Sequence, residues 1–187
     1  MFEVEAKFKI RDVEQYRQQL REQFGVEFGP VREESDLFFQ HMTRDFRQTD
    51  ECLRLRMSPC GIFVTYKGPK LDGTTKTREE IELPVGGFAS EQQTLDQWQT
   101  FFERLGFKAA AKVVKKRCST IVEWATVTYE VTLDELPGIG FFTEWETVCD
   151  SEDKIAESRA NLLKCVSMFD LGDSIRKSYL ELQTEIS

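Results

Sequence analysis

Histidine is nearly absent from this chain, which contains His41 and no other. A single histidine excludes zinc sites and catalytic groups that need several, so any metal ion here is expected to use oxygen ligands. The five cysteines are odd in number and include no C-x-x-C pair, which indicates reduced thiols and a cytoplasmic protein. No apolar run approaches the roughly 18 residues that a membrane span needs, so no membrane partner is expected.

Positive charge is also in short supply, since 25 Lys and Arg face 33 Asp and Glu for a net charge of −8. This balance argues against nucleic acid or an anionic membrane as a partner. It still permits a small polyanion held by a local basic cluster. The length of 187 residues predicts one domain spanning residues 1–187.

Most of the chain alternates between apolar and polar residues, which is the period of a β-strand. The alternation predicts strands at residues 1–10, 34–40, 51–58, 61–68, 76–85, 111–122, 126–134 and 141–149. Tight turns at Asp72-Gly73 and Pro137-Gly138 join neighbouring strands, so the sheet is expected to be antiparallel.

Three helices are expected between the strands, each with an N-terminal capping signal. They begin after Asp12, after Ser90 and after Asp150-Ser151. Each has one apolar face, so the helices are expected to pack on the outside of a single sheet. The fold class predicted from these elements is α+β.

The first strand carries Glu3, Glu5 and Lys7 on one face, with Glu3 and Glu5 about 7 Å apart. Later strands repeat this separation of a charged face from an apolar one. The recurring charged positions are Arg54, Arg56, Lys67, Arg78, Lys115, Arg117, Asp134, Glu144 and Glu146.

Two interpretations of these charged faces remain open. The sheet can expose them to water, or it can close so that they line an interior while helices cover the apolar exterior. The second is favoured for the whole set, because a solvated face has no need of arginines able to form paired hydrogen bonds. Desolvating the charges costs several kcal/mol each, so bound ions are expected inside.

The interior would then hold two kinds of ligand. Carboxylates of Glu3, Glu5, Asp134, Glu144 and Glu146 are suited to Mg²⁺ or Mn²⁺. The basic side chains are suited to phosphates. Metal-binding acids and phosphate-binding bases in one cavity are typical of phosphoryl or nucleotidyl transfer.

The order of these motifs resembles the CYTH superfamily, the triphosphate tunnel metalloenzymes. The resemblance begins with E-x-E-x-K at residues 3–7 and extends through Leu53-Arg54-Leu55-Arg56, Tyr66-Lys67-Gly68-Pro69, Lys115-Lys116-Arg117 and Glu144-Trp145-Glu146 to Lys177-Ser178-Tyr179. It covers nearly the whole chain and is greatest for the class IV adenylate cyclase branch. It implies a closed eight-stranded antiparallel β-barrel, a triphosphate lying along the tunnel, and two divalent cations.

The resemblance implies conversion of ATP to cyclic AMP and pyrophosphate. Hydrolysis of an inorganic or organic triphosphate, such as thiamine triphosphate, remains open, as does a non-catalytic module that binds polyphosphate or nucleotide. Family members are often homodimers.

Within that framework each charged position receives an expected role. Glu5, Lys7 and Lys67 are the expected catalytic residues. The expected substrate-binding residues are Arg54, Arg56, Lys67, Arg78, Lys115, Arg117 and Lys177. A C-terminal strand around Ser178 and Tyr179 is expected to close the barrel and bring Lys177 towards its interior.

Overall fold

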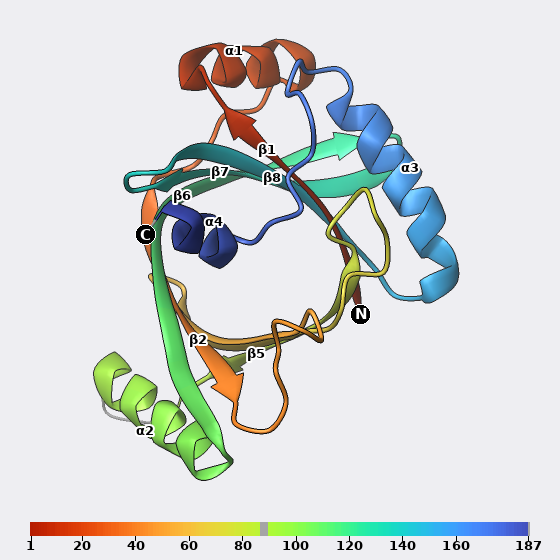
Figure 1. Ribbon diagram of the computed structural model, residues 1–187. Helices are drawn as coiled ribbons and strands as arrows, with labels where there is room; N and C mark the ends of the chain where they lie inside the picture. Colours follow the sequence, from red (N-terminus) through yellow and green to blue (C-terminus); the bar gives the residue numbers. More distant parts are fainter. Residues whose placement is uncertain (87–89, 187) are drawn as a thin grey trace.

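A closed ring of antiparallel strands forms the body of the protein in this computed structural model, which describes residues 1–86 and 90–186 (Figure 1). The strands are β1 (Phe2–Ile10), β2 (Arg32–His41), β3 (Cys52–Ser58), β4 (Gly61–Lys67), β5 (Arg78–Val85), β6 (Phe107–Trp124), β7 (Val127–Leu136) and β8 (Gly140–Cys149). Their order around the ring is β1-β5-β4-β3-β2-β6-β7-β8. The predicted closed eight-stranded barrel is confirmed.

The pairing around the ring is uneven on the two sides of β1. Nine residue pairs join β1 to β8, from Phe2–Cys149 to Ile10–Phe141. In the described chain, two pairs join β1 to β5, Phe2–Glu79 and Glu3–Arg78. The contact between β1 and β5 is therefore the short seam of the barrel.

The three predicted helices lie outside the ring, as expected: α1 (Val13–Phe24), α2 (Glu91–Arg104) and α3 (Ile155–Val166) (Figure 1). A 3₁₀ turn, η1 (Glu152–Lys154), precedes α3. Asp12 and Ser90 cap α1 and α2 by accepting hydrogen bonds from the backbone N–H groups of Gln15 and Gln93. No helix in the two described ranges is long and apolar enough to cross a membrane.

Apolar side chains face outwards from the strands and are covered by helices. Trp145 is fully buried beneath α1 and α3, and its indole N–H donates to the Tyr16 hydroxyl at 2.9 Å. A second cluster, which includes Leu55, Ile62 and Phe102, lies under α2. Because the apolar face of each strand packs against the outer helices, the charged face of the strand points into the ring.

The C-terminal segment departs from the sequence prediction, since Tyr179–Ile186 forms a helix, α4, rather than a strand. The cause is a reciprocal cap at its start. The Ser178 N–H donates to the Glu181 carboxylate at 2.6 Å, and the Glu181 N–H donates to the Ser178 hydroxyl at 3.2 Å. The ring closes through β1 and β8 instead, and α4 lies over one part of its opening, near β6 and β7 (Figure 1).

Candidate active site in the barrel interior

The interior of the barrel contains a cavity of about 1440 Å³ that is lined by charged side chains. Strand alternation places them there, because every second residue of each strand points into the ring. The predicted site residues that line this cavity are Glu3, Glu5, Lys7, Arg54, Arg56, Lys67, Arg78, Lys115, Arg117, Glu144 and Glu146. The structure therefore brings most of the predicted site together.

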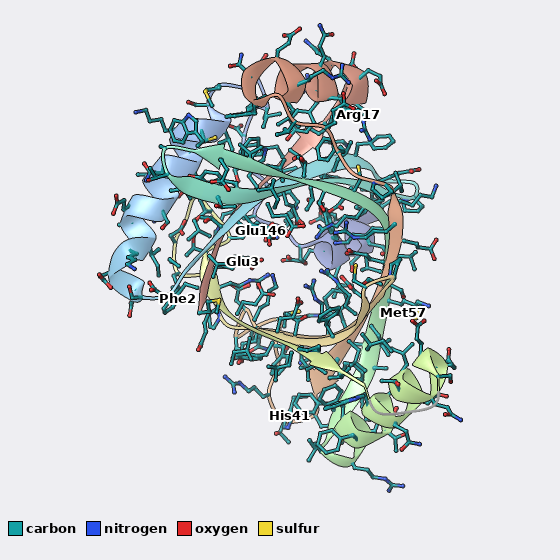
Figure 2. All side chains as sticks on the ribbon, turned by 180° about the vertical axis from the view of Figure 1, so that it is seen from behind. Phe2, Glu3, Arg17, His41, Met57 and Glu146 are labelled. Carbon is teal, nitrogen blue, oxygen red and sulfur yellow. The ribbon has the colours of Figure 1, made fainter. Side chains whose placement is uncertain are left out.

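One wall of the cavity is acidic and is formed by β1 and β8. Glu5 of β1 pairs directly across the sheet with Glu146 of β8, and Glu3 lies two residues away on the same face. Figure 2 shows Glu3 and Glu146 close together inside the ring, whereas Arg17 and Met57 lie outside it. Glu3, Glu5 and Glu146 form the group called here the acidic wall.

The carboxyl groups of the acidic wall lie close together away from water, which disfavours their ionised forms. Burial raises the pKa of Glu3, Glu5 and Glu146, and carboxylates nearby add to the effect. For Glu5 the neighbouring carboxylate is Glu144, and for Glu146 it is Glu3. A bound cation would relieve this repulsion.

Two lysines partly balance the acidic wall. The Lys67 ammonium lies 2.6 Å from Glu3 and 2.8 Å from Glu80. Lys76 lies 2.5 Å from Glu5 and 3.5 Å from Glu144. Lys76 was not predicted as a site residue, although the strand predicted at residues 76–85 includes it; in the structure it precedes β5 and lies in the connection between β4 and β5.

The other side of the cavity is basic and combines β3 with β6. Arg54 and Arg56 project from β3, while Lys115 and Arg117 project from β6; these four residues are called here the basic wall. Strand β2 lies between β3 and β6. The guanidinium groups can bind phosphate oxygens in pairs, and the ammonium supplies a point charge.

Two acids of β2 occupy the middle of the basic wall. Arg56 donates two hydrogen bonds to Asp36, at 2.7 and 2.9 Å, and Lys115 lies 3.3 Å from Glu34. Burial alone would raise the pKa of Glu34, but Lys115, Arg117 and Arg56 outweigh it and lower that pKa to about 2. Both acids are therefore ionised and hold the cations in place.

Arg117 connects the basic wall to β7 and β8. It donates to both oxygens of Asp134, at 2.6 and 2.5 Å, and to Glu144 at 2.5 Å. Asp134 is fully buried and also accepts a hydrogen bond from the Tyr179 hydroxyl at 2.7 Å. Asp134 lies behind the residues that line the cavity, so its geometry fits support of Arg117 rather than contact with a ligand.

Lys7 lies between the two walls and is fully buried. Its ammonium is 3.5 Å from Glu144 and 3.9 Å from the centre of the Tyr179 ring. Burial and the neighbouring Lys76 ammonium lower the pKa of Lys7 to about 7, against the opposing effect of Glu144 and Glu5.

Two predicted site residues do not line the cavity: Asp134, predicted as a metal ligand, and Lys177, predicted to bind substrate. Lys177 lies outside the barrel interior. Its side chain is about half exposed and forms an ion pair with Glu185. The reason is the helix that replaces the expected strand, since α4 begins at Tyr179 and turns the preceding residue outwards. Tyr179 itself reaches the cavity.

The acidic wall has the hard oxygen donors that Mg²⁺ and Mn²⁺ prefer. Among residues 1–86 and 90–186, no three acidic, histidine or cysteine side chains already converge as a metal site. Lys67 and Lys76 are the present partners of Glu3 and Glu5. The donor set nevertheless fits a divalent cation.

Comparisons with known proteins agree with this architecture. The CYTH domain model matches residues 1–179. A Methanocaldococcus jannaschii protein named putative adenylate cyclase MJ0240 is 37% identical over 186 residues, covering 98% of this chain and 99% of that protein.

Solved structures give the same result. The PH1819 protein of Pyrococcus horikoshii OT3 is 37% identical with a TM-score of 0.83, covering 99% of both chains. A structure described as a putative adenylate cyclase from Vibrio parahaemolyticus is 26% identical with a TM-score of 0.76, covering 98% of both chains. From its charged tunnel and its match over residues 1–179, this chain belongs to the CYTH domain family.

Proposed function

We propose that this protein is a metal-dependent enzyme that binds a nucleoside triphosphate in the barrel and converts ATP to cyclic AMP and pyrophosphate. The observation that carries the proposal is the juxtaposition, in one cavity, of the basic wall and the acidic wall, with Glu3, Glu5, Lys115 and Arg117 buried. The names of the Methanocaldococcus jannaschii and Vibrio parahaemolyticus relatives support the choice of cyclase.

The basic wall would bind the triphosphate. Arg56 and Arg117 already donate hydrogen bonds to carboxylates, so their guanidinium groups are oriented before a ligand binds. Lys115 and Arg78 would add charge along the phosphate chain, and Lys67 would lie near the reacting phosphates. The ribose 3′-oxygen would bond to the α-phosphorus and lose its proton to water as the bond from that phosphorus to the bridging oxygen breaks. These cations would stabilise the charge that develops on pyrophosphate.

The acidic wall would hold Mg²⁺ or Mn²⁺, with Glu3, Glu5 and Glu146 as ligands and Glu144 beside them. When bound, such an ion supplies charge stabilisation at the phosphate oxygens. The protein's own contribution is to orient the phosphates and to exclude water through burial of the site. Lys7 would stabilise charge between the two walls.

Hydrolysis of a triphosphate by the same groups is the main alternative, and a non-catalytic binding module is the second. Purified protein would be incubated with Mg²⁺ or Mn²⁺ and either ATP or tripolyphosphate, and the products separated by chromatography. Cyclic AMP with pyrophosphate is the expected result. Orthophosphate without cyclic nucleotide would make the protein a hydrolase, and binding without turnover would make it a binding module.

A matched pair of lysine variants tests whether the cavity is the site. Lys115→Met removes a buried ammonium from the basic wall, and Lys177→Met removes an exposed one outside the cavity. The first should lower turnover by about 10²-fold, as loss of a single charge-stabilising group commonly does. The second should leave turnover unchanged, and equal effects of both would contradict the assignment.

A further inference from the structure

The connection between β4 and β5, residues 68–77, carries a charged side chain into the cavity. The Lys76 ammonium lies 2.5 Å from Glu5 and 3.5 Å from Glu144. Lys76 and its two sequence neighbours are buried, although they precede β5 and belong to no strand. The position of this ammonium therefore depends on the contacts that hold the connection against the barrel.

Asp72 fixes the shape of the turn within the connection. Its carboxylate accepts hydrogen bonds from the backbone N–H groups of Thr74 and Thr75, both at 2.7 Å, and from the Thr75 hydroxyl at 2.6 Å. These bonds join residues no more than three apart in sequence. They shape the turn, but they do not place it relative to the barrel.

An arginine from the C-terminal part of the chain holds the turn from outside. Arg176, which precedes α4, donates to the Asp72 carbonyl at 2.7 Å and to the Thr75 carbonyl at 3.4 Å. Arg159 of α3 adds an ion pair with the Asp72 carboxylate at 3.6 Å. The two carbonyls that bind Arg176 are those of the turn directly before Lys76.

The segment that carries Arg176 is itself attached to β1. The Ile175 N–H donates to the Lys7 carbonyl at 2.7 Å, and the Lys76 N–H donates to the Glu5 carbonyl at 2.9 Å, two residues away on the same strand. Both segments therefore lie along β1, and Arg176 joins them. Replacing its side chain leaves the Ile175 hydrogen bond in place, because that bond is made by the backbone.

We propose that Arg176 is a positioning residue: by binding two carbonyls of the β4–β5 connection, it holds the Lys76 ammonium beside Glu5. This inference rests on the proposed function, because it assigns Arg176 a role in turnover in the same cavity. Arg176 is exposed and does not line the cavity, so it acts through Lys76 and not on the substrate. If this ammonium moved away, Glu5 and Glu144 would have one cation fewer between them.

Hydrogen exchange followed by mass spectrometry tests the contact on the full chain without substrate. In Arg176→Ala, the amide hydrogens of residues 70–77 are expected to exchange at least about fivefold faster than in the wild type, with the β1–β8 ladder unchanged. Lys177→Ala is the matched control, because it removes a neighbouring cation that pairs with Glu185 outside the cavity, and it should keep wild-type exchange. Unchanged exchange of the connection in folded Arg176→Ala would overturn the inference.

Turnover of ATP or tripolyphosphate with Mg²⁺ separates the positioning of Lys76 from a general loss of structure. Arg176→Ala should lower kcat by about tenfold, because a remote change that misplaces an active-site group slows the reaction. Lys76→Met should lower kcat by about 10²-fold. Adding Arg176→Ala to Lys76→Met should then change kcat by less than about twofold, because Arg176 acts through the group already removed.

Circular dichroism and thermal unfolding would confirm that each variant is folded. Losses that multiply in the double variant would overturn the inference, and so would a wild-type kcat in Arg176→Ala; both results leave the proposed function intact. A wild type that turns over neither ATP nor tripolyphosphate would contradict the proposed function and the role of Arg176 in turnover. The exchange measurement would still decide whether Arg176 holds the connection.

Discussion

Glu34 lies among three cations of the basic wall, and its ion pairs measure how strongly this wall contributes to folding stability. It is almost fully buried, with Lys115, Arg56 and Arg117 at 3.3, 3.6 and 3.8 Å. Its pKa falls from an ordinary 4.5 to about 2 because these cations outweigh burial. At about 1.4 kcal/mol per pKa unit, this difference corresponds to roughly 3 kcal/mol of folding stability at pH 7.

The pH dependence follows from the direction of the shift. A carboxylate whose pKa is lower in the folded state contributes its stability above the unfolded pKa, and loses it as pH falls through the folded pKa. Glu34→Gln removes this contribution. The variant should be less stable than the wild type by about 3 kcal/mol at pH 7, and by about 1 kcal/mol at pH 3.

Urea unfolding at both pH values, followed by tryptophan fluorescence, would measure the difference. Glu33→Gln is a suitable control, because Glu33 neighbours Glu34 in sequence but is exposed. The same substitution should tighten the binding of tripolyphosphate, since it releases Lys115 and Arg117 from a competing carboxylate. A Glu34→Gln variant as stable as the wild type at pH 7, with unchanged affinity, would refute the reasoning.

Three further predictions concern the acidic wall and the outer core. Glu5→Gln should abolish turnover and weaken the dependence on Mg²⁺ with little change in thermal stability; an undiminished rate would contradict the acidic wall as metal site. Mg²⁺ should raise the melting temperature more at pH 8 than at pH 5, because protons compete for Glu3, Glu5 and Glu146, whose pKa values are raised; calorimetry would show equal shifts if no carboxylate were involved. Trp145→Ala should lower the free energy of unfolding by about 3–5 kcal/mol through an internal void, and a loss below 1 kcal/mol would show that the core relaxes around it.

The strands and the inward direction of their charges could be predicted from the sequence, because alternation fixes which face each residue occupies. Glu3, Glu5 and Lys7 fall on one face whatever the rest of the chain does. The same rule places Glu34 and Asp36 inside the barrel. Neither was predicted as a site residue, because the prediction rested on strands with prominent arginines or paired glutamates.

Residues outside the strands could not be placed in the same way. Lys76 reaches Glu5 because its backbone N–H donates to the Glu5 carbonyl at 2.9 Å, a contact between segments far apart in sequence. Tyr179 was expected on a strand, although Ser178 and Glu181 carry the spacing of a capping box. That local signal would have identified the helix, but not its position at the opening of the barrel.

The short seam between β1 and β5 makes the barrel wall uneven in strength. Beyond Glu80, whose N–H donates to the Met1 carbonyl at 3.0 Å, the outer edge of β5 has no partner strand within the described residues. Pro84 on this stretch has no N–H to offer, which protects the edge from pairing with another chain. Local unfolding should therefore start where the β4–β5 hairpin leaves β1, and amide hydrogens near this edge should exchange with solvent sooner than those of the β1–β8 ladder.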